Sequence, residues 1–359
     1  MMNRIAVKIG SNVLTRADGT LDITRMSALT DQVAELHRQG MEIILISSGA
    51  VASGRSEIKA EKKLDPVSAR QLYSAVGQAK LINRYYELFR EHGICCGQVL
   101  TTKENFGSRT HYLNQKHCME VMLANRVIPI VNENDTISVT ELMFTDNDEL
   151  SAMIAAMMGM DALIILSNID GIYNGNPSDP AAAVIREIPA AGEDISEYIQ
   201  SGRSSFGRGG MLTKYRIACK VADEGITVII ANGKRDNILP QLLTTDSTTA
   251  VCTRFLPSSK PVSSVKKWIA HSDGFAKGEI HINKGASDAL LSPKATSILL
   301  IGVTRISGNF EKGDIVRIFN DSGTQIGVGC TDYNSQETAR QIGCRDLKPL
   351  VHYDYLYLD

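Results

Sequence analysis

Short apolar runs alternate with longer helical patterns through residues 1–255, and this alternation restricts the fold more than any other feature. The runs are rich in isoleucine and valine, as strands covered on both faces should be. Apolar residues at helical spacing fill most of the intervals. The pattern predicts an α/β domain, in which an open, mostly parallel sheet is sandwiched by helices. The expected strands are Arg4–Gly10, Glu42–Ile46, Ile94–Leu100, Val127–Val131, Ala162–Leu166 and Thr227–Ile230.

Two of the expected helices have clear limits. One spans about Ile23 to Arg38 and carries its apolar residues on a single face. The other begins at Asp65-Pro66, an N-cap followed by proline at the first helical position, and runs towards His92. By contrast, the segment Thr136 to Thr145 alternates apolar and polar residues, which predicts a projecting β-hairpin.

The composition changes after Phe255. The stretch PSSKPVSSVKK is rich in proline, serine and lysine and is typical of a linker. Beyond Gly274 the apolar runs are short and β-like, with turns such as Asn320 to Gly323 between them. The expected organisation is therefore a first domain over residues 1–255, a linker over 256–273 and a small β-rich domain over 274–359.

Bulk composition excludes several classes of protein. A net charge of −2 over 359 residues gives no electrostatic reason to expect nucleic acid or an anionic membrane as a partner. No apolar run approaches the ~20 residues of a membrane span, and no signal peptide is recognisable. The seven cysteines show no C-x-x-C spacing, so neither a disulfide framework nor a zinc site is indicated. We expect a cytoplasmic protein with reduced thiols and no metal bound by the protein alone.

Three turns of small residues follow expected strands or precede a helix. They are Gly10-Ser11-Asn12, Ser47 to Gly54, and the loop Ser201 to Lys214. Such turns let backbone N–H groups approach an anion, and a helix start adds a favourable dipole. The dinucleotide fingerprint is absent, and the near-match to a P-loop at Gly202 lacks its Lys-Ser/Thr ending. Together the turns predict a phosphate ligand bound in another way.

Two lysines stand in unfavourable places beside these turns. Lys8 lies within the apolar strand IAVKIG, where an unpaired buried lysine is rare. An edge strand or a snorkelling side chain is the alternative explanation. Lys214 falls in the first turn of the helix MLTKYRIACKVA, where a cation opposes the helix dipole. Such a pair suits a site that neutralises a transferring phosphoryl group.

Two acidic clusters lie at the edges of regular elements. In the first, the run Val127 to Val131 ends in Asn132, Glu133, Asn134 and Asp135. In the second, FTDNDELSA places Asp146, Asn147, Asp148 and Glu149 before an apolar helix. Helix capping by Thr145 explains part of the second cluster, and a calcium loop is disfavoured because the EF-hand glycine and glutamate are missing. A site for a cationic group explains both clusters.

The ordered motifs resemble those of the amino acid kinase family. They are IAVKIGSNVL, ILISSGAVASGR, VIPIVNENDTI, FTDNDELSA, LSNIDGIY and GRGGMLTK. The closest resemblance is to the branch that phosphorylates the side-chain carboxylate of L-glutamate to glutamyl 5-phosphate, the first step of proline biosynthesis. It covers the whole chain, since the segment from Gly274 resembles the PUA domain that many bacterial members carry.

The resemblance implies roles for individual residues. Lys8 and Lys214 match the lysines that neutralise the phosphoryl group, and Asp148 matches the aspartate that holds them. Glutamate binding is implied for Ser48, Gly49, Ala50, Asn132, Asp135, Asp146 and Asn147. ATP binding is implied for Lys8, Ser167, Asn168, Arg208, Gly209, Gly210, Met211, Leu212, Thr213 and Lys214. Ser167-Asn168 departs from a common Thr-Asp, Asn176-Pro177 departs from Asp-Pro, and Arg208 stands where threonine is frequent.

Further expectations follow from the same resemblance. ATP would arrive with Mg²⁺, and proline would act as a feedback inhibitor. The chain would form a homo-oligomer, either a dimer or a tetramer, and would pass its product to a glutamyl phosphate reductase.

Other functions remain to be weighed. Aspartate, acetylglutamate, carbamate and uridylate kinases share the fold, but aspartate kinases usually append ACT domains and the others usually append nothing comparable to the segment after Gly274. RNA binding by that segment is disfavoured, because it holds nine Lys and Arg against ten Asp and Glu. A non-catalytic amino acid sensor is disfavoured because Lys8, Asp148 and Lys214 are all retained.

Overall fold

The computed structural model describes residues 2–107, 109–138, 147–177, 179–190, 210–243, 250–259, 264–270, 272–292 and 296–358. The chain divides into two compact units. One comprises Met1–Lys103 and Asn114–Pro261, and the other comprises Glu104–Leu113 and Val262–Asp359.

An eight-stranded sheet in the order β3-β4-β2-β1-β5-β7-β8-β6 forms the centre of the first unit. Its strands are β1 Arg4–Ile9, β2 Glu42–Ser47, β3 Cys96–Thr101, β4 Ile128–Glu133, β5 Ala162–Ser167, β6 Glu187–Ile188, β7 Thr227–Asn232 and β8 Cys252–Phe255. All neighbours pair in parallel except β7 and β8, which are antiparallel. The mostly parallel sheet is therefore confirmed, and each expected strand is present with ends that shift by at most two residues.

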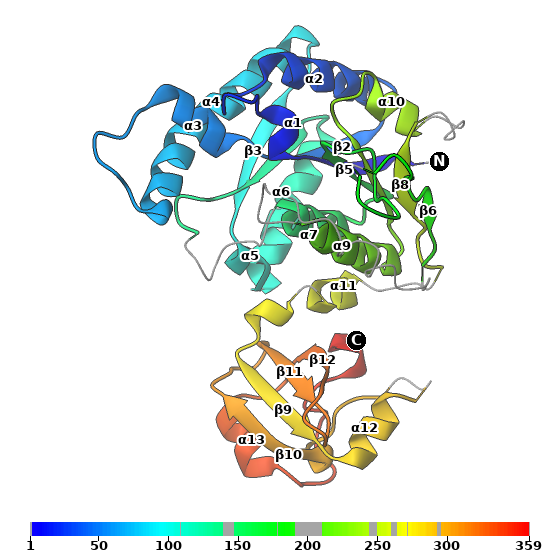
Figure 1. The fold of residues 1–359 in the computed structure, drawn as a ribbon. Helices are drawn as coiled ribbons and strands as arrows, with labels where there is room; N and C mark the ends of the chain where they lie inside the picture. Colours follow the sequence, from blue (N-terminus) through cyan, green and yellow to red (C-terminus); the bar gives the residue numbers. More distant parts are fainter. Residues whose placement is uncertain are drawn as a thin grey trace. The chain divides into compact units, whose positions relative to one another are not determined.

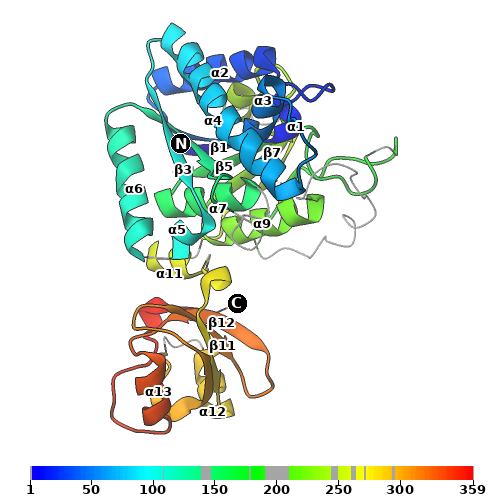
Figure 2. The same cartoon turned by 90° about the vertical axis from the view of Figure 1, so that its left-hand side faces the viewer.

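Helices cover both faces of this sheet (Figures 1 and 2). The helices of the first unit are α1 Ser11–Leu14, α2 Ile23–Arg38, α3 Ala50–Glu57, α4 Pro66–Glu91, α7 Asn147–Met158, α9 Met211–Asp223 and α10 Ile238–Leu243, while α5 Lys103–Gly107 belongs almost entirely to the second unit and α6 Arg109–Ala124 begins in the second unit and ends in the first. The expected limits of α2 are confirmed. So is the start of α4, where the Asp65 carboxylate accepts hydrogen bonds from the N–H groups of Val67 and Ser68.

The two faces of β1 have different neighbours because alternate side chains of a strand point in opposite directions. Ile5, Val7 and Ile9 join the apolar core with residues of α2 and α4. Lys8 points to the opposite face, which α7 and α9 cover. Since β1 lies between β2 and β5, an edge strand does not explain this lysine.

Two glycines let α3 and α4 pack against each other at very short distance. A Cβ atom on Gly77 would lie 1.8 Å from the Ala50 carbonyl oxygen, and one on Gly54 would lie 1.9 Å from that of Tyr73. No side chain fits at such distances. This close contact fixes the first half of α4 against the helix that follows the Ser48 turn.

The second unit contains a five-stranded sheet in the order β10-β9-β11-β12-β13. Its elements are α11 Ser264–Ala270, η2 Asp273–Phe275, β9 Gly278–Ile282, α12 Lys284–Leu290, η3 Leu300–Gly302, β10 Val303–Gly308, β11 Ile315–Phe319, β12 Gln325–Cys330, α13 Ser335–Gln341, η4 Tyr353–Tyr355 and β13 Leu356–Leu358. The expected β-rich domain is confirmed. Part of the apolar run before β10 forms η3 instead of strand, and it buries Leu300 in the small core.

The second unit also contains a segment from the first third of the chain. Trp268 on α11 is buried, and its Nε1 donates a 2.7 Å hydrogen bond to the carbonyl oxygen of Phe106. The Arg109 guanidinium lies over the rings of Tyr112 and Trp268, 5.3 and 5.0 Å from their centroids. Helix α11 thus occupies part of the expected linker and is packed, because its tryptophan has an apolar site to fill.

Candidate active site

The described residues of the sequence motifs lie together at one edge of the first sheet, the edge formed by the carboxyl ends of its parallel strands. Strands β1, β2, β4, β5 and β7 run parallel, so the loops that follow them lie beyond the same edge. Ligands of open parallel sheets bind at this edge, where the order of connections reverses. Here the reversal falls at β1, since the chain proceeds to β2 on one side and later to β5 on the other.

Lys8, Asp148 and Lys214 come together at this edge. Lys8 Nζ lies 2.6 Å from Asp148 Oδ1, and Lys214 Nζ lies 2.7 Å from Asp148 Oδ2. The Asp148 side chain is fully buried, and the two lysine side chains are 7% and 13% exposed. The elements that carry them are the strand β1 and the first turns of α7 and α9.

One carboxylate between two ammonium groups determines the electrostatics here. Burial acts to raise the pKa of Asp148, but the charges of Lys8 and Lys214 outweigh it and hold that pKa below the ordinary aspartate value. The three groups carry one net positive charge at neutral pH. A buried positive pair held at fixed positions suits an anion whose charge increases during a reaction.

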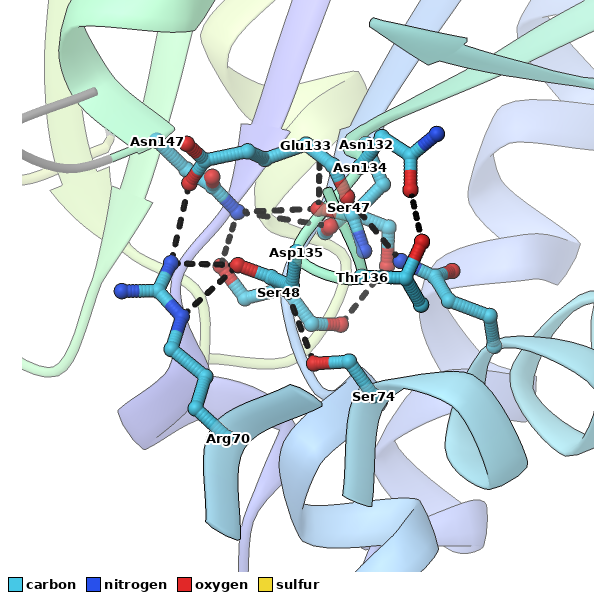
Figure 3. A network of polar contacts seen from close by, with 11 residues as sticks. Ser47, Ser48, Arg70, Ser74, Asn132, Glu133, Asn134, Asp135, Thr136 and Asn147 are labelled. Atoms are coloured by element: carbon cyan, nitrogen blue, oxygen red, sulfur yellow. Dashed lines mark hydrogen bonds and ion pairs between the residues drawn. The ribbon is translucent and has the colours of Figure 1, made fainter. Parts of the chain in front are cut away.

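A second network surrounds the turn after β2 (Figure 3). Asn147 Nδ2 donates to Ser48 Oγ at 3.0 Å and to Asn132 Oδ1 at 3.3 Å. Gly49 has φ of 107°, which a residue with a side chain rarely adopts, and it is the N-cap residue directly before α3. The structure therefore brings together Ser48, Gly49, Ala50, Asn132 and Asn147, as the motifs predicted.

Asp135 lies in the same network but has a partner that the sequence reasoning missed. Arg70 of α4 donates from Nε to Asp135 Oδ1 at 2.8 Å, and its Nη2 contacts both Asp135 Oδ1 and Glu133 Oε2, the latter at 2.9 Å (Figure 3). Ser74 Oγ donates to Asp135 Oδ2 at 3.1 Å. No local signal in the sequence indicates this contact, because Arg70 lies 63 residues before Glu133 and 65 residues before Asp135.

The expected nucleotide residues lie farther along the same edge. Ser167 ends β5 and is buried, and the exposed Asn168 follows it. Gly210 precedes α9 and offers no side chain to cap it, and the main-chain N–H groups of Thr213 and Lys214 donate to its carbonyl oxygen at 3.1 and 3.2 Å. At Gly10 a Cβ atom would lie 3.0 Å from the Leu166 carbonyl oxygen, so the turn after β1 requires a small residue.

A further polar group lies beside Ser167 and was not predicted. Asp170 accepts hydrogen bonds from Arg235 Nε and Nη2 at 2.6 and 2.7 Å, and from Asn232 Nδ2 at 3.1 Å. These hydrogen bonds, first those from Arg235, lower the pKa of Asp170. The aspartate lies within the LSNIDGIY motif, but its arginine partner is 65 residues away.

Some predicted residues lie outside the part of the chain that the structure describes. These are Asp146, Arg208 and Gly209, with Thr145 and most of the expected hairpin. Within the described residues, no group of three or more His, Cys, Asp or Glu side chains could hold a metal ion. None of the described helices combines the length and the apolar character that a membrane crossing requires.

Comparison with known proteins identifies the family of both domains. The sequence model of the amino acid kinase family matches residues 3–232, and that of the PUA domain matches residues 278–349. Glutamate 5-kinase of Bacteroides thetaiotaomicron is 72% identical over 356 residues, which cover 99% of this chain and 98% of the relative. Glutamate 5-kinase of Chlorobaculum tepidum is 46% identical over 360 residues, with 99% and 97% covered.

More distant relatives carry the same name. Glutamate 5-kinase of Pelobacter propionicus is 37% identical over 359 residues, which cover 100% of this chain and 95% of the relative. Among solved structures, the UMP kinase of Ureaplasma parvum aligns with a TM-score of 0.46 and 13% identity over 71% of this chain and 99% of its own. From the matched domains and the full-length relatives, the chain belongs to the amino acid kinase family, in the group of the glutamate 5-kinases with a C-terminal PUA domain.

Proposed function

We propose that the chain transfers the terminal phosphoryl group of ATP to the side-chain carboxylate of L-glutamate, giving glutamyl 5-phosphate for proline biosynthesis. The observation that carries this proposal is the buried arrangement of Lys8, Asp148 and Lys214 beside the Ser48 turn. Full-length similarity to proteins named glutamate 5-kinase supports the choice of glutamate.

The proposed reaction requires the protein to position the two substrates and to neutralise charge on the transferring group. A glutamate side chain has a pKa of about 4.3, so its carboxylate is already ionised and needs no general base. A carboxylate oxygen forms a bond to the terminal phosphorus, the bond to the bridging oxygen breaks, and ADP leaves with the electron pair. Lys8 and Lys214 neutralise the charge that moves during this step, and Asp148 holds their ammonium groups in place.

We assign each of the two substrates to its own group of binding residues. We assign glutamate to Ser48, Gly49, Ala50, Asn132, Asp135 and Asn147, which surround the turn after β2. We assign the nucleotide to Ser167, Asn168, Gly210 and the first turn of α9. In this arrangement the two lysines lie between the groups, where the phosphoryl group passes from one substrate to the other.

Purified protein is expected to form a hydroxamate from L-glutamate, MgATP and hydroxylamine, because hydroxylamine traps the labile acyl phosphate. N-acetyl-L-glutamate should give no product, since acetylation removes the ammonium group that the carboxylates of this pocket would bind. The measurement is the colorimetric hydroxamate assay, run in parallel with L-aspartate and UMP as acceptors. Equal turnover of glutamate and N-acetylglutamate, or a preference for aspartate or UMP, would overturn the assignment.

Proline is the expected feedback inhibitor, and we propose that it shares the glutamate pocket. It carries a cationic nitrogen and a carboxylate, as the α-carbon of glutamate does, so the same contacts near Asp135 and Asn147 suit both. Proline should therefore raise the apparent KM for glutamate with little change in extrapolated kcat. The Asp135→Asn variant should lose affinity for both amino acids together, because the substitution removes a charge that both would use.

The test is a matrix of initial rates over glutamate and proline for the wild type and Asp135→Asn. A large loss of glutamate affinity with unchanged sensitivity to proline would contradict a shared pocket. It would place the inhibitor at a separate site.

Several features complete the proposal. Mg²⁺ would enter with ATP and neutralise its phosphates, leaving the positive charges of Lys8 and Lys214 for the transferring group. The enzyme would act in the cytoplasm as a dimer or tetramer and pass its labile product to a glutamyl phosphate reductase. We assign the PUA domain a structural or regulatory role, because its charge balance is unsuited to RNA.

A further inference from the structure

One face of α4 holds the loop that follows β4. Four polar side chains of this helix donate hydrogen bonds to residues 133–136: Arg70, Gln71, Ser74 and Gln78. Their spacing places them along one side of the helix. Gln71 and Gln78 bind main-chain carbonyl oxygens, at 2.9 and 3.2 Å. Only Arg70 among the four brings a charge to the loop.

Arg70 faces two carboxylates that are almost completely buried. The side chains of Glu133 and Asp135 are 3% and 8% exposed, while that of Arg70 is 27% exposed. The same Nη2 atom contacts both carboxylates, so one guanidinium is shared between them (Figure 3). Two buried carboxylates without a cation would repel each other and any anion that approached.

This arrangement leaves one net negative charge in the three side chains together. Glutamate carries two carboxylates and one ammonium group, so it is an anion overall. A pocket with two uncompensated carboxylates would repel it, and a pocket with none would leave its ammonium group without a counter-charge. The balance of one cation against two anions suits the single ammonium group.

We propose that Arg70 and Glu133 set glutamate affinity through a charge group that they share with Asp135: the guanidinium, which contacts Asp135 from two nitrogen atoms and Glu133 from one, compensates one of the two carboxylates and leaves the equivalent of one for the substrate ammonium. Both are positioning residues, because they act through Asp135 and not on the transferred phosphoryl group. The inference rests on the proposed function, since it concerns the same pocket. It adds a determinant of affinity on α4, 65 residues from Asp135 in the sequence.

The charge balance can be changed in each direction and then restored. Arg70→Met leaves two negative charges, and Glu133→Gln leaves none, because the remaining arginine then neutralises Asp135 alone. Each single variant is expected to raise the KM for glutamate about tenfold or more, with kcat within about threefold of the wild type. The double variant Arg70→Met/Glu133→Gln again carries one negative charge. It should return the KM to within about threefold of the wild type.

Three further variants separate charge from structure. Arg70→Lys keeps the positive charge and should stay close to the wild type in KM. Gln71→Ala removes an uncharged hydrogen bond from the same helix to the same loop, and should change KM less than threefold. Arg84→Met removes a guanidinium from α4 whose partner is Glu87, and should leave both constants unchanged.

A purely structural role for Arg70 predicts a different pattern. The losses in Arg70→Met and Glu133→Gln would then add in the double variant, and Gln71→Ala would resemble Arg70→Met. Either result overturns the proposal. If Arg70→Met does not fold, the comparison of the double variant with Glu133→Gln carries the test, because the proposal requires the double variant to have the lower KM. Failure of the wild type to phosphorylate glutamate would instead reject the proposed function.

Discussion

Replacing Lys8 or Lys214 with alanine is expected to lower kcat for acyl phosphate formation by about 100- to 1,000-fold. The ammonium groups lie 2.6 and 2.7 Å from the buried carboxylate of Asp148, so this ion pairing holds both lysines at fixed positions. Removal of one leaves Asp148 and the remaining lysine with no net charge, so the transferring phosphoryl group loses the positive charge of the site. The measurement is the initial rate of hydroxamate formation at saturating glutamate and MgATP.

The matched control is Lys220→Ala, which removes a lysine from the last turn of the same helix as Lys214. We expect its kcat to equal that of the wild type. Each variant should unfold cooperatively, because Asp148 retains one ammonium partner in either substitution. A folded Lys8→Ala or Lys214→Ala variant with near-normal kcat would reduce that lysine to a structural ion-pair partner.

Substitution of Asp148 by asparagine is expected to lower the free energy of unfolding by about 3–5 kcal/mol. The new side chain has nearly the same shape, so the effect isolates the charge. Without the carboxylate, the ammonium groups of Lys8 and Lys214 repel each other in a site with little access to water. Catalysis should fall as well, since both lysines lose the group that positions them. Urea denaturation of the two proteins gives the difference directly.

The difference in the free energy of unfolding between the wild type and Asp148→Asn should depend on pH, because the pKa of Asp148 is lowered in the folded state. A carboxyl group whose pKa is lower in the folded state stabilises the fold fully above its unfolded value, about 3.9. That stabilisation is lost as the pH falls through the folded value. The gap between wild type and Asp148→Asn should therefore stay constant above about pH 5 and narrow only in stronger acid. Asp31→Asn, at an exposed 2.8 Å side-chain contact with His92, should change the free energy of unfolding by less than about 0.5 kcal/mol. A gap of that size for Asp148→Asn would contradict the structural role assigned to its charge.

Much of the first domain could be predicted because its signals are local. Isoleucine-rich runs identify the strands, and Asp65 followed by proline identifies the start of α4. Five strands extend one or two residues beyond the predicted ends, to Ser47, Thr101, Glu133, Ser167 and Asn232. Polar residues at the carboxyl ends of parallel strands continue the hydrogen-bond ladder although the apolar pattern has stopped.

The site was only partly predictable, for the opposite reason. Lys8 and Lys214 could be predicted as site residues because each stands in a locally unfavourable position. Arg70 gave no such signal, since an arginine on a helix is ordinary until the fold brings Glu133 and Asp135 to it. Arg235 escaped notice in the same way, because its partner Asp170 is distant in the sequence. The packing of α11 could not be read from a proline- and serine-rich composition, although Trp268, the only tryptophan of the chain, was a clue.

Residues 104–113 belong to the second unit, so recombination within this gene must keep them matched to the part of the unit that begins at Val262. A crossover placed in the segment before α11 would pair one parent's Trp268 with the other parent's Phe106 and Tyr112. Those side chains share a buried aromatic cluster, so changes on one side must be matched on the other. The C-terminal part of the second unit, from Val262, is therefore not expected to evolve independently of residues 104–113. Its lineage should track that of a ten-residue segment encoded some 150 codons upstream, and chimeras should tolerate exchange only when both pieces come from the same parent.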